Sequence, residues 1–117
     1  MSESVLSTHV LNTAEGCPAE GVKVELWRLG PPEHLATGVT DKDGRVSEPL
    51  LPAIRFRPGR YELRFHLGAY FAARGLEGGD PRYLDIVPVR IGLAGTEAHY
   101  HVPLLCSPWG YTTYRGS

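Results

Sequence analysis

This sequence of 117 residues is poor in cysteine and methionine, and it contains no long apolar run. Its two cysteines, Cys17 and Cys106, lie far apart and fit no metal-binding or redox spacing, and two are too few for a disulfide framework. We therefore expect reduced thiols in a reducing compartment. No apolar stretch approaches the roughly 18 residues of a membrane span, which predicts a soluble chain without a membrane partner.

An excess of charge of either sign is also absent. Lys and Arg number 12 and Asp and Glu 13, which gives a formal net charge of -1. The arginines are scattered from Arg28 to Arg115 and form no basic cluster, so a nucleic-acid partner is disfavoured. Ordinary shares of hydrophobic (42%) and charged (21%) residues exclude a disordered chain and predict a single globular domain over residues 1–117.

Targeting signals are missing as well. Residues 1–10 have neither a basic region nor a long apolar core, so no signal peptide is expected. The sequence ends in Arg-Gly-Ser, unlike the Ser-Lys-Leu ending of peroxisomal proteins. We expect a cytoplasmic location.

Short strands separated by turns are the main pattern that is present. Fourteen glycines and ten prolines, about a fifth of the chain, interrupt it at intervals of about ten residues. Residues 22–29 and 61–65 alternate between apolar and polar side chains, which predicts strands with one buried face. This pattern is typical of a β-sandwich or a barrel.

The sequence predicts three further elements. Residues 37–46 are expected to form a hairpin, because Asp43-Gly44 suits a tight turn. Residues 84–91 form a strand that Pro88 restricts to an edge or a bulge. Residues 68–75 predict one short helix that ends at a glycine.

Histidines are the first candidates for chemistry. Residues 99–105 form a predicted strand in which His99 and His101 share one face, opposite the apolar face. His9 lies in a first strand near residue 10. Three interpretations are open: surface histidines on an outward face, a zinc site completed by a third ligand, or acid–base catalysis without metal.

Arg45 and the C-terminal residues are the remaining candidates. Arg45 follows the Asp43-Gly44 turn, where its guanidinium could hold a carbonyl or an anion, or simply be solvated. Residues 109–117 are aromatic, whereas termini are usually polar and frayed. We expect this tail to dock, either as plain packing or as the lining of a site.

Two segments together resemble the transthyretin-like proteins. Residues 9–24 read HVLNTAEGCPAEGVKV and residues 100–113 read YHVPLLCSPWGYTT, similar to the N-terminal and C-terminal signatures of that family. The predicted helix also falls where that fold has its only helix. The resemblance extends over about residues 6–117. It implies an all-β, transthyretin-like (prealbumin-like) two-sheet β-sandwich with Greek-key connections and one short helix.

Within this superfamily, the 5-hydroxyisourate hydrolases differ from the hormone carriers in four features, and this sequence resembles the enzymes. Matching positions are His9, Arg45, His101 and the C-terminal Tyr-Arg-Gly-Ser at residues 114–117; only Cys106 departs, where an aliphatic residue is expected. The resemblance implies hydrolysis of 5-hydroxyisourate at its N1–C6 amide, in urate degradation. The alternatives are a carrier of small molecules without catalysis and a structural module without a site.

The resemblance also implies roles for individual residues. Catalytic roles fall to His9, Arg45, His101 and Ser117, and substrate binding to His9, Arg45, Tyr114 and Arg115. No metal and no cofactor are implied. His99 is not one of these residues, and we expect it to lie beside the site. Members of the family form homotetramers, dimers of dimers with sites between the dimers. Such an assembly would explain why polar histidines occupy an outward face.

Overall fold

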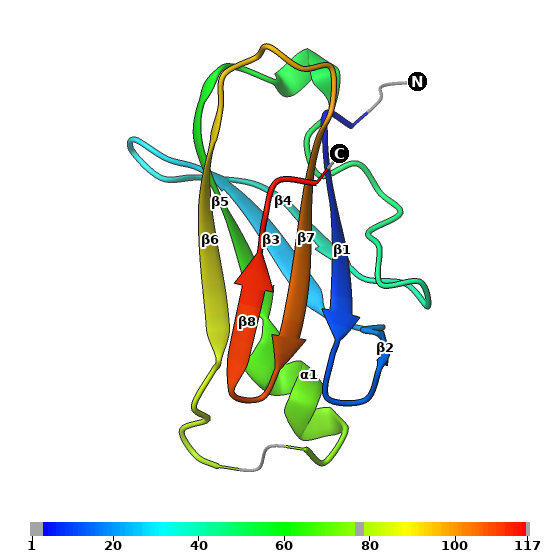
Figure 1. The fold of residues 1–117 in the computed structure, drawn as a ribbon. Coiled ribbons are helices and arrows are strands. Elements are labelled where there is room, and N and C mark those ends of the chain that lie inside the picture. The colour runs from blue at the N-terminus through cyan, green and yellow to red at the C-terminus, as the bar shows by residue number, and fades with distance from the viewer. Residues whose placement is uncertain (1–3, 77–78, 117) are drawn as a thin grey trace.

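A computed structural model describes residues 4–76 and 79–116, which fold into two four-stranded sheets packed face to face (Figure 1). One short helix, α1 (Leu67–Ala73), lies across one end of the sandwich, and a 3₁₀ turn (Ala53–Arg55) lies at the other. Two sheets and one helix confirm the predicted fold class. No helix in the described ranges has the length and apolar character needed to cross a membrane.

Sheet I, as we call it, has the strand order β2-β1-β7-β8. Its strands are β1 (Leu6–Asn12), β2 (Cys17–Pro18), β7 (Tyr100–Ser107) and β8 (Gly110–Thr113). The central pair, β1 and β7, is parallel, and the other pairs are antiparallel. The two ends of the chain therefore lie side by side in one sheet, although they are about 90 residues apart in sequence.

Sheet II has the strand order β4-β3-β5-β6, and all its pairs are antiparallel. Its strands are β3 (Lys23–Arg28), β4 (Glu33–Val39), β5 (Gly59–His66) and β6 (Ile86–Leu93). Pro88 lies in β6, the edge strand, where its missing N–H costs no ladder bond on the open side. The prediction of an edge strand around Pro88 is confirmed.

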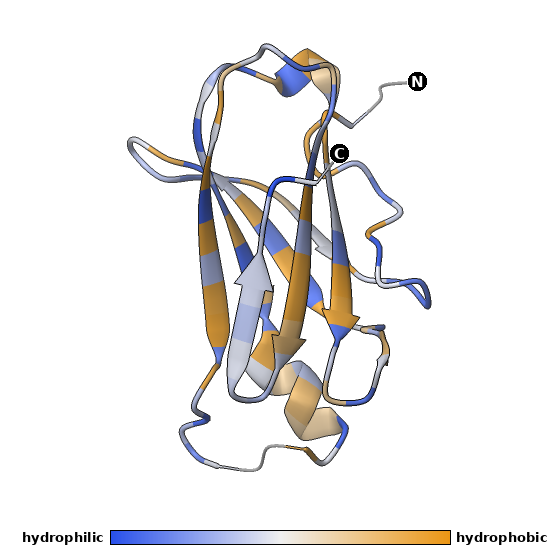
Figure 2. Cartoon of the chain, in the orientation of Figure 1, coloured by the Kyte–Doolittle hydropathy of each residue, from blue (hydrophilic) through white to orange (hydrophobic). Residues whose placement is uncertain are grey.

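The core forms where the inward residues of both sheets meet. Tyr61, Leu63 and Phe65 of β5 are fully buried and face Val10 and Leu104 of sheet I. Hydrophobic residues, orange in Figure 2, lie along strands of both sheets, whereas the pale colour of β8 shows intermediate hydropathy. Truncating one such side chain, Phe65 for example, is expected to cost about 3–5 kcal/mol. The sandwich therefore supplies a rigid support for what its outer faces carry.

The predicted hairpin over residues 37–46 is wrong in its second half: the first strand and the tight turn at Asp43-Gly44 are present, but the return strand is not. β4 ends at Val39, and the chain then turns toward sheet I, where the Val10 amide donates to the Gly44 carbonyl at 2.8 Å. Asp41 explains the change, because its carboxylate accepts hydrogen bonds from the Asp43 and Arg45 amides at 2.9 and 3.1 Å. Two backbone hydrogen bonds also close the turn, from the Gly44 amide to the Asp41 carbonyl at 2.9 Å and from the Asp41 amide to the Arg45 carbonyl at 2.7 Å. Arg45 then forms an isolated bridge with His9 rather than a return strand.

Gly44 is essential to that crossing. Its φ is +78°, a conformation that side chains other than glycine rarely adopt. A Cβ at this position would lie 2.4 Å from the Val10 carbonyl oxygen. Glycine is thus required for the turn to dock on β1.

Candidate active site

Two histidines lie on the outward face of sheet I. In the parallel pairing of β1 with β7, Ser7 is opposite His101 and His9 is opposite Pro103. Along β1 the even-numbered residues are buried, so Ser7 and His9 point outward, as His101 does from β7. His101 lies opposite the buried face of its strand, as predicted. His99 is exposed and precedes β7, so the predicted strand does not include it.

The 41–45 turn brings Arg45 to the same place. His9 and Arg45 form an isolated antiparallel bridge, and residues opposite one another in such a pair have Cβ atoms about 4.5–5.5 Å apart. The Arg45 side chain is exposed and its positive charge acts on His101. A guanidinium therefore stands beside two imidazoles.

The C-terminal segment crosses the histidines from the other side. The Gly116 amide donates to the His101 carbonyl at 2.9 Å, in an isolated bridge. A Cβ at Gly116 would lie 2.6 Å from His101 Cδ2, so glycine lets the chain pass directly over the imidazole. In Figure 1 this segment, red, leaves β8 and runs across β7 toward β1.

The remaining predicted residues are placed less closely. Tyr114 is exposed, and Arg115 forms an ion pair with Glu97 at 2.7 Å while its guanidinium lies over the Tyr100 ring. Arg115 thus points to the loop before β7 and not to the histidines. Ser117 lies outside the described residues. The structure gathers His9, Arg45, His101 and the backbone of Gly116.

The electrostatics of this cluster favour a neutral imidazole. Burial lowers the pKa of His101 below its usual value, and the positive charges of Arg45, His99 and His9 lower it further. A histidine that stays neutral at lower pH keeps a lone pair available for proton transfer. The zinc interpretation gains no third ligand: within residues 4–76 and 79–116, no three His, Cys, Asp or Glu side chains gather as a metal site would require.

A hollow of about 380 Å³ lies next to His101. It opens where the edge strands β6 and β8 of the two sheets face each other, and Tyr100, His101 and Tyr114 are among its lining residues. This volume lies within the range of small-molecule sites, about 300–1,000 Å³. The tail segment was expected to dock, and it forms one wall of this hollow.

Ser7 was missed by the sequence reasoning. Its hydroxyl lies 2.7 Å from His101 Nδ1, and both residues are half-buried. The signal was present, because Ser7 and His9 are two residues apart in one strand and so share a face. The contact itself depends on the register of β1 against β7, which the sequence pattern does not define.

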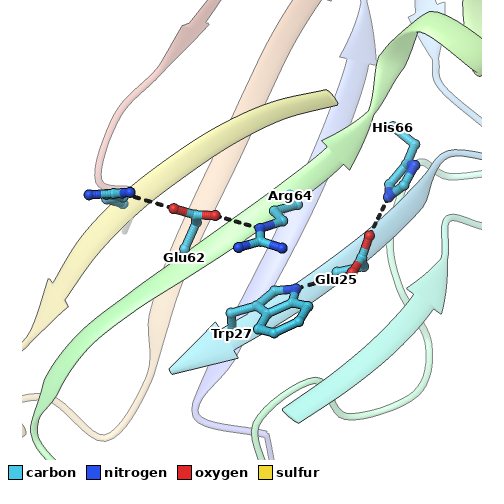
Figure 3. Close-up of polar contacts among 6 residues, drawn as sticks. Glu25, Trp27, Glu62, Arg64 and His66 are labelled. Carbon is cyan, nitrogen blue, oxygen red and sulfur yellow. Dashed lines mark hydrogen bonds and ion pairs between the residues drawn. The ribbon is translucent and has the colours of Figure 1, made fainter. Parts of the chain in front are cut away.

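A second polar cluster lies on the outer face of sheet II (Figure 3). Glu62 is 4% exposed between Arg64 and Arg90, and the hydrogen bond from Arg64 lowers the pKa of its carboxyl group. Arg64 also covers the Trp27 ring at 4.2 Å, and Glu25 accepts from the Trp27 indole and pairs with His66. Each acid here has basic partners, so the cluster is a stabilising ladder of side chains.

A two-sheet sandwich that carries two histidines, an arginine and a crossing C-terminal segment on one outer face defines a transthyretin-type protein with a polar site. The chain belongs to the HIUase/Transthyretin family, whose model matches residues 6–116. The family predicted from residues 9–24 and 100–113 is thereby confirmed.

Individual relatives agree with the family. A protein of Rhizobium meliloti (strain 1021) named 5-hydroxyisourate hydrolase 2 is 54% identical over 114 residues, 96% of this chain and 95% of that protein. The structure of Klebsiella pneumoniae 5-hydroxyisourate hydrolase has a TM-score of 0.81 and 40% identity, over 98% of this chain and 100% of that one. The structure of sea bream transthyretin in complex with thyroxine has a TM-score of 0.86 and 27% identity, over 96% of this chain and 94% of that one.

Proposed function

We propose that this chain is a hydrolase that opens 5-hydroxyisourate in urate degradation, and that it uses the histidine cluster of sheet I. The observation that carries the proposal is the convergence of His9, Arg45 and His101 on one outward face, from three separate segments of the chain. Relatives at about half identity over nearly the whole length are named for this activity. Acid–base chemistry with a positive charge nearby is what amide hydrolysis requires.

In the proposed mechanism, His9 and His101 orient a water molecule and take its proton. The water oxygen bonds to C6 while negative charge develops on the C6 oxygen, and Arg45 stabilises that charge. The C6–N1 bond then breaks, the proton passes to N1, and C6 is released as a carboxylate. General-base help of this kind contributes about a hundredfold to ten-thousandfold. Neither a metal nor a cofactor takes part in these steps.

The C-terminal residues complete the proposed site. Tyr114 orients the substrate ring from the wall of the hollow, and Ser117 supplies a polar group beside it. Arg115 is proposed to bind substrate, and to do so it would exchange its ion pair with Glu97 for the ligand. That exchange is plausible energetically, because exposed ion pairs contribute only about 0–1 kcal/mol.

We further propose a homotetramer, a dimer of dimers, with the histidine faces turned toward each other. Two observations support it. The edge strands β6 and β8 carry the exposed apolar side chains of Ile86 and Tyr111, and the nearby pair Tyr83 and Trp109 is also exposed. Open edges and exposed aromatic patches mark sites of association. If the sites lie between dimers, activity per chain should fall when the protein is diluted to monomers; a fully active monomer contradicts the assembly.

The test of the function is the ultraviolet decay of 5-hydroxyisourate, generated in place from urate by urate oxidase. The full chain should accelerate the decay, and a variant that lacks residues 114–117 should not. The alternative, a carrier of the transthyretin type, predicts that neither protein changes the decay while both bind a small aromatic ligand. A chain that neither accelerates the decay nor binds such a ligand would favour the structural module.

A further inference from the structure

Ser7 contacts the His101 ring directly. Its hydroxyl oxygen lies 2.7 Å from Nδ1, the ring nitrogen nearer the backbone. The Ser7 backbone also favours the charged form of this imidazole. A hydrogen-bond acceptor acts in this sense, whereas a donor would oppose the positive charge.

The other ring nitrogen is left for chemistry. Gly116 closes the Cδ2 edge of the ring, and Ser7 occupies the Nδ1 edge, so the imidazole is held from both sides. Among residues 4–76 and 79–116, no hydrogen bond to Nε2 is recorded. The Ser7 hydroxyl oxygen can accept as well as donate; where it accepts, Nδ1 carries the proton and Nε2 carries the lone pair.

We propose that Ser7 is a positioning residue that holds neutral His101 as the Nδ1–H tautomer, so that Nε2 is the atom that takes the proton from water. The inference rests on the proposed hydrolase function for its catalytic meaning. It separates the roles of the two histidines: His101 is the base, and His9, without such a partner in the described ranges, orients the water.

The charges around His101 define the direction of the expected shift. His9 faces it from β1, Arg45 from the 41–45 turn and His99 from the segment before β7, and all three lower its pKa. Ser7 acts in the opposite sense, because an acceptor at Nδ1 stabilises the imidazolium. Removing the hydroxyl should therefore lower the pKa of His101 further.

The experiment compares Ser7→Ala with Ser7→Thr, which keeps the hydroxyl, and with Thr8→Val as the matched control. Thr8 is the next residue of β1, but its hydroxyl is buried on the opposite face, where it donates to the Val102 carbonyl at 2.6 Å. Nitrogen-15 NMR of the imidazoles reports the tautomer, and the pH profile of kcat/KM reports the pKa of the base.

In the full chain, His101 should show a protonated Nδ1 and an unprotonated Nε2. Ser7→Ala should mix the tautomers, lower kcat about tenfold, the effect of losing one hydrogen bond, and move the acid limb of kcat/KM to lower pH with KM unchanged. Ser7→Thr should restore all three properties. Thr8→Val should lower only the melting temperature.

Three outcomes would overturn the proposal: a proton on Nε2 in the full chain, an acid limb that moves to higher pH in Ser7→Ala, or the same response in Thr8→Val. The tautomer is measured without substrate. An inactive protein with a protonated Nδ1 would therefore contradict the hydrolase function and leave the role of Ser7 in place. An active protein with the opposite tautomer would do the reverse.

Discussion

The two outer faces of the sandwich use polar residues in opposite ways. On sheet II, Glu62 is enclosed by Arg64 and Arg90, and Glu25 by Trp27 and His66, so each acid is matched by donors of the same face. On sheet I, the side chains of His9, Arg45 and His101 form no ion pair in the described parts of the chain, and the nearby Asp41 carboxylate binds the backbone amides of its own turn. The acids of the first arrangement are matched by donors of the same face, whereas the basic side chains of the second are left for the ligand that the proposed function supplies.

This difference separates stability from function. A buried carboxylate that loses its partner leaves an uncompensated charge, which is strongly destabilising. A cluster of like charges costs stability while it is empty and regains it when an electron-rich ligand binds. Substitutions on sheet II should therefore change folding with little effect on rate, and substitutions on sheet I should do the opposite.

The largest effect is expected from His101→Asn on sheet I. The variant keeps a polar group but loses the base, so hydrolysis of 5-hydroxyisourate should slow by about a hundredfold to ten-thousandfold. Its melting temperature should stay close to that of the parent. His34→Asn is the control, because His34 lies on β4 of sheet II, where it contacts Thr37. Equal losses of activity in both variants would contradict the division of roles.

Gly44→Ala should lower both the stability of the fold and the activity. The new Cβ would meet the Val10 carbonyl oxygen at a φ of +78°, so the 41–45 turn must shift away from β1. Such strain costs about 1–3 kcal/mol, and the shift carries Arg45 away from His9. We expect a lower melting temperature together with a raised KM. Gly16→Ala is a suitable comparison, because Gly16 has φ +68° with open space around it, so only the strain remains.

The strands of sheet II could largely be predicted from the sequence, whereas parts of sheet I depend on how its strands pair with one another. Alternation of apolar and polar residues along 22–29 and 61–65 identifies β3 and β5, the two central strands of sheet II, because the apolar residues of each strand lie on its core face. β8 has no such alternation, since Gly110–Thr113 contains neither an aliphatic residue nor a charge. Its existence depends on pairing with β7, which local patterns do not report.

The site residues divide in the same way. The strand period places His101 opposite the apolar residues of its own strand, and the resemblance assigns the roles of His9 and His101. That the two histidines share one face follows from the pairing of β1 with β7. Ser7 becomes visible only when β1 pairs with β7 in parallel, because a change of one residue in register would turn it away from His101. The return strand of the hairpin predicted over residues 37–46 is absent because the turn docks on β1: the Asp41 carboxylate accepts from the Asp43 and Arg45 amides, and the Gly44 carbonyl accepts from the Val10 amide.

A smaller effect is expected on sheet II from Arg64→Ala. This change removes one of the two ion pairs of Glu62 and uncovers the Trp27 ring, so the free energy of unfolding should fall by about 1–3 kcal/mol. Activity of the folded protein should be unchanged. Arg60→Ala is the matched control from the same strand, with an exposed side chain that makes no ion pair in the described ranges. A similar loss of stability in both would show that the ladder contributes little.

The smallest effect is a separation of two pH dependences. The pKa of His101 lies below its usual 6.5, so activity should persist somewhat below neutral pH and then fall as the imidazole is protonated. The pKa of Glu62 lies below its usual 4.5 in the folded chain, so its contribution to stability is complete above the unfolded value and is lost as the pH falls through the folded one. On lowering the pH, the rate should therefore decline first, while thermal melts still show a folded protein.

A melting temperature that falls together with the rate would mean that unfolding, and not protonation of His101, ends the activity. In Arg64→Ala the pKa of Glu62 in the folded chain should lie closer to its unfolded value, so the loss of stability on lowering the pH should be smaller, and the pH profile of the rate should not move.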